Sequence, residues 1–175
     1  SPDALLEMRR REPIMAATVL ALLAIIPPTL FAMAIDDRTL HGINIWIKPL
    51  KFEIAIIVYI ATLSWFAGWL PGQHQQTGTY RVYSALVATA IALEMIWIVS
   101  AAANGLGSHY NVGTPFMQSV YSTMGALAVL LTSASLVYGI KFARHSTSTL
   151  DPTFRLSLAL GLILTFVLTL IAAGV

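Results

Sequence analysis

The stretch NIWIKPLKFEIAI, residues 44–56, places charged side chains at the start of a long apolar run. Lys48 and Lys51 are three residues apart, so they share one face of a helix near its N-terminus. The free backbone amides of a helix N-terminus carry partial positive charge, and together with two lysines they suit a phosphate or a carboxylate. Alternatively, the lysines only extend to a membrane–water interface, with Trp46 as an interfacial aromatic residue.

Two glutamates are predicted to lie inside apolar runs. Glu53 follows the lysines by about one helical turn, where it can pair with a lysine or with a group on another helix, or form a structural ion pair. Glu94, in ALEMIWIVS, lies roughly 15 Å from the end of its run at 1.5 Å per residue. A carboxylate at such depth costs about 2.5–3.5 kcal/mol. We therefore predict that Glu94 faces a helix-bundle interior, as a ligand contact, proton carrier or ion site, or as a neutral acid bonded to a neighbouring group.

A second polar segment, NGLGSHYNVGTPF, covers residues 104–116. Its glycines predict a shaped loop that holds Asn104, His109, Tyr110 and Asn111. His109, with His41 from the first segment, has the chemistry of a base, a metal ligand or a haem ligand. However, no HxxxH or HExxH motif occurs and no histidine lies inside an apolar run. We predict no metal and no cofactor, and a histidine bonded to nearby backbone is the simpler interpretation.

The next apolar run begins TPFMQSVYST, and its Gln118 and Ser122 are four residues apart. We predict that they line the same cavity as Glu94. The predicted ligand-binding residues are Asn44, Trp46, Lys48, Lys51, Glu53, Glu94, Asn104, His109, Tyr110, Asn111 and Gln118.

The composition identifies the elements that must position these residues. The chain has 175 residues, of which 57% are hydrophobic and 10% charged, whereas soluble domains carry about 25% charged residues. It contains no cysteine, which excludes disulfides, thiolate catalysis and cysteine-based metal sites. The net charge of +2 is too small to predict a nucleic-acid partner.

Five apolar runs reach the length that a bilayer requires, about 20 residues. We predict an all-α integral membrane bundle that forms one transmembrane domain over residues 1–175. A short amphipathic interfacial helix, in SPDALLEMRRRE, comes before the first span. Proline stands at or near the expected start of four runs, where a missing N–H costs nothing. The predicted spans are residues 14–35, 49–70, 82–103, 115–142 and 152–175.

The distribution of lysine and arginine over the loops predicts the orientation. With a cytoplasmic N-terminus, seven of these ten residues lie inside and three outside. Those predicted outside are Arg38, Lys48 and Lys51. We therefore predict a cytoplasmic N-terminus, with both polar segments on the outer face.

The pattern Asn44-x-Trp46-x-Lys48-Pro49-x-Lys51-Phe52, followed by SHYN and TPF at the next outer loop, resembles an uncharacterised family of bacterial multi-pass inner-membrane proteins. The resemblance implies a location in the bacterial inner membrane and implies no activity.

Three functions remain open on the sequence. The first is an outer-facing cavity that binds or transports a small anionic or amphiphilic molecule of the lipid or quinone class. The second is an accessory subunit of a larger membrane complex, or a homo-oligomer, surrounded by membrane lipids. The third is a membrane-embedded enzyme that uses His109 as a base with Glu53 or Glu94, although no nucleophile motif supports it.

Overall fold

The computed structural model describes residues 2–70, 77–108, 113–144 and 150–173. These residues form six α-helices and one β-hairpin, and five of the helices are long and apolar enough to cross a membrane. The chain is therefore a multi-pass helical membrane protein, as predicted. The elements are α1 (Pro2–Arg11), α2 (Pro13–Ile35), β1 (Thr39–Leu40), β2 (Ile43–Asn44), α3 (Ile47–Ala67), α4 (Gly78–Ala103), α5 (Pro115–Arg144) and α6 (Pro152–Ala173).

Proline opens three of the long helices, at Pro13, Pro115 and Pro152, because the first helical amides have no intrahelical acceptor. α3 instead begins two residues before Pro49. The amide of Leu50 already bonds the carbonyl of Trp46 at 3.2 Å, which makes Pro49 the third helical residue, where its N–H is still not needed.

α4 begins at Gly78, four residues earlier than the apolar run predicts. The hydroxyl of Thr77 accepts a hydrogen bond from the amide of Tyr80 at 3.3 Å, which is the usual role of threonine before a helix. α2 continues through Pro27 and Pro28 without interruption.

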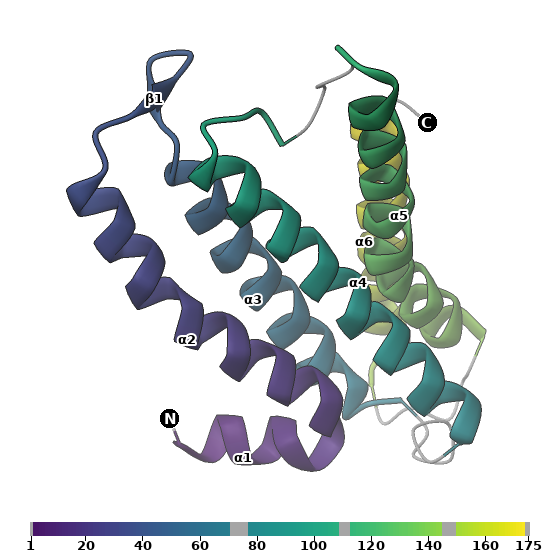
Figure 1. Ribbon diagram of the computed structural model, residues 1–175. Helices are drawn as coiled ribbons and strands as arrows, with labels where there is room; N and C mark the ends of the chain where they lie inside the picture. Colours follow the sequence, from purple (N-terminus) through teal and green to yellow (C-terminus); the bar gives the residue numbers. More distant parts are fainter. Residues whose placement is uncertain (1, 71–76, 109–112, 145–149, 174–175) are drawn as a thin grey trace.

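The helices α2 to α6 run up and down in sequence, and α1 lies across the end of α2 and α3 (Figure 1). We call this the α1 end of the bundle. The β-hairpin, the start of α3 and the last turn of α4 lie at the opposite end, which we call the hairpin end. Each long helix packs against the next along the chain, and the α5–α6 pair has the most extensive contact.

Two clusters of buried apolar side chains hold the bundle together. One holds together the helices α1, α2, α3 and α4 and includes Val19, Ile60 and Ile91. The other lies toward the α1 end, where Ala67, Phe142 and Leu162 bring together α3, α5 and α6. Outside these clusters, large apolar side chains are exposed along all five long helices, as expected for surfaces that face lipid acyl chains.

Candidate ligand-binding site at the hairpin end

The β-hairpin shapes the surface beside the start of α3. Its two strands pair antiparallel, with Leu40 opposite Ile43. The two residues between them, His41 and Gly42, have φ values of +54° and +78°. Positive φ at both central residues is the hallmark of a type I′ turn, whose twist matches that of the paired strands. This hairpin was not predicted from the sequence.

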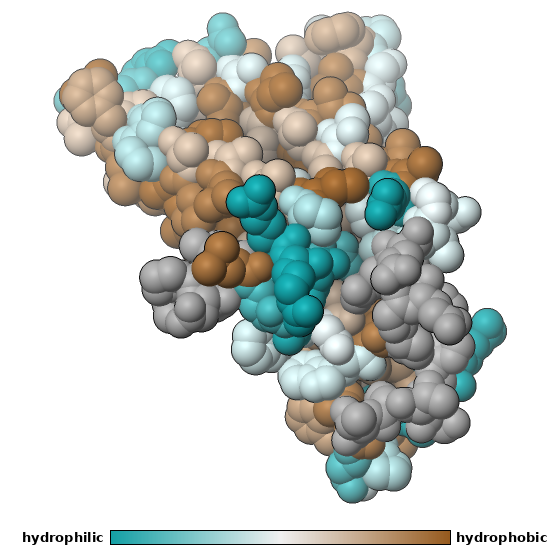
Figure 2. All heavy atoms as spheres, turned by 90° about the horizontal axis from the view of Figure 1, so that it is seen from below, coloured by the Kyte–Doolittle hydropathy of each residue, from teal (hydrophilic) through white to brown (hydrophobic). Residues whose placement is uncertain are grey.

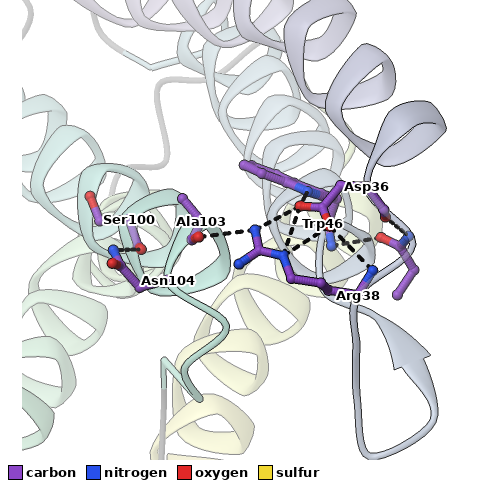
Figure 3. Close-up of polar contacts among 7 residues, drawn as sticks. Asp36, Arg38, Trp46, Ser100, Ala103 and Asn104 are labelled. Carbon is purple, nitrogen blue, oxygen red and sulfur yellow. Dashed lines mark hydrogen bonds and ion pairs between the residues drawn. The ribbon is translucent and has the colours of Figure 1, made fainter.

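Asp36 fixes the hairpin to α3 (Figure 3). Its carboxylate accepts hydrogen bonds from the Arg38 guanidinium, the shortest at 2.7 Å, and from Trp46 Nε1 at 2.9 Å. These contacts, first of all those from Arg38, hold the pKa of Asp36 well below its usual range. Trp46 is thus bound to the hairpin through its indole N–H.

Asn44 joins the hairpin to the helix in the same way. Its Nδ2 donates to the carbonyl of Asp36 at 2.8 Å, and its Oδ1 accepts from the amide of Trp46 at 2.9 Å. Such a bond to the backbone two residues on is typical of asparagine before a helix.

Arg38 also links the hairpin to the end of α4. Its Nη2 donates to the carbonyl of Ala103 at 3.0 Å, one of the carbonyls that the α-helix pattern leaves without a partner. Asn104, next to it, is exposed and donates from Nδ2 to the carbonyl of Ser100 at 2.8 Å (Figure 3). Asn104 therefore caps α4.

A pocket of about 680 Å³ lies between these elements. The hairpin, the first turns of α3, the last turns of α4 and the segment that follows α4 all contribute to its wall. The wall is mainly apolar, with polar groups from His41, Asn44, Lys48, Lys51 and Ser108. The apolar part comes from Leu40, Ile43, Ile45, Ile47, Pro49, Phe52, Ile98, Ala102 and Leu106. Both polar segments of the sequence analysis thus reach one pocket.

The two lysines occupy different environments in this pocket. Lys48 is half-buried, with its Nζ 5.9 Å from the centre of the Phe52 ring, a distance typical of a cation–π contact. Lys51 is exposed at the rim. A charged group that enters the pocket therefore meets one cation beside an apolar wall and one in contact with solvent.

Five of the other predicted residues do not line the pocket. The Trp46 indole bonds the Asp36 carboxylate, and the Asn104 side chain bonds the carbonyl of Ser100. Glu94 is 2% exposed, in agreement with its predicted inward orientation. Gln118 is exposed on α5 and does not line the pocket.

Glu53 is also fully buried, behind the pocket wall, and Thr29 of α2 lies 2.7 Å from its Oε1. It therefore contacts a group on another helix, one of the two predicted arrangements. His109, Tyr110 and Asn111 lie outside the described residues.

Within the described ranges, no group of three or more His, Cys, Asp or Glu side chains is placed to hold a metal ion. His41 is exposed at the tip of the hairpin. The pocket instead presents amine, amide and hydroxyl groups above an apolar surface, and these are the groups that bind an anionic or polar head with an apolar tail.

A second polar cluster, which the sequence analysis missed, lies at the α1 end. Glu12, between α1 and α2, is 3% exposed. Its Oε1 accepts hydrogen bonds from the hydroxyls of Tyr138, at 2.9 Å, and Tyr80. These two hydroxyls also contact each other, and Lys141 Nζ lies 4.8 Å from the centre of the Tyr80 ring. The sequence did contain a signal for this cluster. Glu12, Tyr80 and Tyr138 each lie at or near the end of a predicted span, and those ends are predicted to lie on the same side of the membrane.

Figure 2, the view onto the α1 end, shows a hydrophilic patch bordered by hydrophobic side chains. α1 contributes Arg9 and Arg10, both exposed. Glu7 accepts from Arg10 at 2.8 Å and from Arg11 at 2.7 Å. The Glu12 cluster is therefore buried between the spans, whereas Arg9 and Arg10 of α1 lie on the surface.

No protein-family model matches this chain, and searches of curated proteins and of solved structures found no match.

Proposed function

We propose that this membrane protein binds a small anionic or amphiphilic molecule of the lipid or quinone class in the hairpin-end pocket. The observation that supports this most is the placement of Lys48 and Lys51 on a wall that is otherwise mainly apolar. The volume, about 680 Å³, lies within the roughly 300–1,000 Å³ typical of small-molecule sites.

Lys48 and Lys51 hold the charged or polar head in this proposal. A half-buried ammonium attracts an anion more strongly than one in water, because the surrounding dielectric constant is lower. The amides at the start of α3 add partial positive charge on the same side. Ile98, Ala102 and Leu106 then contact the apolar part of the molecule.

The proposed location is the bacterial inner membrane, with a cytoplasmic N-terminus. The distribution of lysine and arginine assigns the α1 end to the cytoplasm. Seven of these residues belong to that end: Arg9, Arg10, Arg11, Arg81, Lys141, Arg144 and Arg155. The pocket then faces outward, where it takes up its occupant from the outer leaflet or the space outside, for storage or transport.

A second candidate function is that of a subunit in a larger membrane complex or a homo-oligomer. The observation in favour is the exposure of α6. Only 11% of its apolar stretch is buried within the chain. This function would be supported if other chains co-purified with the protein and bound it through α6.

The test is native mass spectrometry of protein extracted gently from its own membrane. We expect a retained small molecule on the wild type, and its loss from Lys48→Ala/Lys51→Ala. The charge-preserving Lys48→Arg/Lys51→Arg variant should retain it. Arg81→Ala/Arg144→Ala, which removes two exposed positive charges at the other end, is the matched control and should also retain it.

The same spectra distinguish the two functions. Partner chains or dimers without any small molecule would favour the subunit function. A small molecule that persists in the double alanine variant would contradict the proposed role of the lysines.

A further inference from the structure

Two glutamates in the spans are buried with incomplete hydrogen bonding. Glu53 in α3 is 0% exposed and Glu94 in α4 is 2% exposed. Glu53 Oε2 and Glu94 Oε1 have no hydrogen-bond partner among the described residues. A buried carboxylate normally has all its oxygens bonded or paired with a cation, because removing its charge from water is costly.

No cation compensates for these oxygens in the part of the chain that the structure describes. The ion pairs found there join Glu7 to Arg10 and Arg11, and Asp36 to Arg38. All of these lie outside the membrane-spanning helices. A neutral carboxylic acid removes the need for a counter-charge, and its O–H is a donor that a carboxylate lacks.

The geometry at Thr29 agrees with a proton on Glu53. Thr29 Oγ1 lies 3.1 Å from the carbonyl of Ile25 and 2.7 Å from Glu53 Oε1. The hydroxyl has one hydrogen, and a threonine inside a helix commonly donates it to the carbonyl four residues earlier. If the hydrogen goes to Ile25, Glu53 must donate in the shorter contact. If Thr29 donates to Glu53 Oε1, the second oxygen of Glu53 still lacks a partner, and a proton there removes the uncompensated charge.

Both glutamates lie close to the pocket wall. Glu53 follows Pro49 by four residues on α3, and Glu94 precedes Ile98 by four residues on α4. Pro49 and Ile98 both line the pocket, and four residues are about one helical turn. The two glutamates thus stand about one helical turn from the pocket residues Pro49 and Ile98, toward the middle of the bundle.

We propose that Glu53 and Glu94 are proton-binding sites in the bundle core, each holding a proton as a neutral carboxylic acid at neutral pH. In each case one proton joins one carboxylate and no other bond changes. The ligand that we propose is a proton, which needs a single oxygen; among the described residues, Glu53 and Glu94 do not belong to a group of three or more His, Cys, Asp or Glu side chains.

Infrared spectroscopy of the protein in lipid nanodiscs at neutral pH tests this. The wild-type minus Glu53→Gln spectrum and the wild-type minus Glu94→Gln spectrum should each show a carboxylic-acid C=O band that the variant has lost. Glu7→Gln is the matched control, because Arg10 and Arg11 lower the pKa of Glu7 to about 2. Its difference spectrum should show only carboxylate bands.

Thr29→Val provides a second test that keeps both glutamates. Loss of the hydroxyl should move the Glu53 C=O band to higher frequency, because the acid loses its hydrogen-bond acceptor. Carboxylate bands in the two glutamine difference spectra would overturn the proposal. This measurement needs no bound ligand, so its result is independent of the proposed function.

Discussion

At the scale of single residues, Glu12 joins more elements than any other polar side chain described above. It lies between α1 and α2 and bonds Tyr80 of α4 and Tyr138 of α5. Burial raises the pKa of Glu12, and the bonds from the two tyrosines and the charge of Lys141 offset part of that rise. The folded state therefore holds the Glu12 proton more tightly than the unfolded chain.

This gives a pH dependence of stability with a definite sign. A raised folded-state pKa stabilises the protein fully below the unfolded pKa, about 4.3 for glutamate. That stabilisation is lost as the pH rises through the folded-state pKa. We expect the melting temperature of the wild type, measured relative to Glu12→Gln, to fall as the pH rises from 4.

Scanning fluorimetry in detergent, repeated over a pH series, measures this difference. Glu7→Gln should give the opposite slope, and only at and below the unfolded-state pKa of about 4.3, because its two arginines lower the folded-state pKa of Glu7. A wild-type and Glu12→Gln difference that does not change with pH would show that Glu12 titrates alike in the folded and unfolded states.

At the scale of helices and strands, the sequence predicts the long helices well and the hairpin not at all. Apolar length and proline position determine a transmembrane helix almost alone, because lipid leaves the backbone no other way to satisfy its hydrogen bonds. The error at the start of α4 comes from the side-chain cap Thr77. The error at the start of α3 comes from Pro49, which is the third helical residue and not the first. The hairpin depends on the backbone of His41 and Gly42, which have positive φ values. A pattern of apolar residues does not predict such a turn.

The pocket was predictable in part for the same reasons. The spacing of Lys48 and Lys51 follows from helix geometry, and both line the pocket. The apolar wall from α4 and the hairpin depends on how Arg38 holds Ala103, a tertiary contact. Gln118 was predicted to share a cavity with Glu94, but its side chain is exposed on the surface of α5.

The α5–α6 pair permits a sharp test of helix packing. A Cβ at Gly139 would lie 2.7 Å from the Ile163 side chain and 3.0 Å from the backbone oxygen of Ala159. Gly139→Ala should therefore force the two helices apart and destabilise the protein by about 1–3 kcal/mol, as overpacking does.

Gly125→Ala on the same helix is the matched control, since a Cβ there meets nothing within 4 Å. Unfolding in increasing dodecyl sulfate, followed by circular dichroism, compares the two variants. Equal stability of both would mean that α6 does not lie against Gly139 as the structure has it.

At the scale of the whole molecule, the polar groups gather at the two ends. The hairpin end holds the pocket, and the α1 end, whose hydrophilic surface is seen in Figure 2, holds the Glu12 cluster and the arginines of α1. Between the two ends, the middle of the bundle holds the two buried glutamates and hydroxyl contacts such as that between Tyr83 and Ser133. Orientation in the membrane therefore decides which side of the cell each polar end meets.

The absence of cysteine from the chain makes the orientation directly measurable. We expect Asp37→Cys, exposed at the hairpin end, to react with a membrane-impermeant maleimide on intact bacterial cells. Arg10→Cys, exposed on α1, should react only after the cells are lysed. The reverse pattern would place the pocket on the cytoplasmic side.

Pro27 and Pro28 in the middle of α2 have a mechanical consequence. Proline has no amide hydrogen, so the carbonyls of Leu23 and Ala24 lose their usual helical donors. α2 is therefore more compliant there than elsewhere, and Thr29 is the next residue. Bending of α2, for example by a thinner bilayer, displaces Thr29 relative to α3 and so changes its contact with Glu53. The double proline thus places the Thr29–Glu53 contact beside the point where α2 has lost two of its backbone hydrogen bonds.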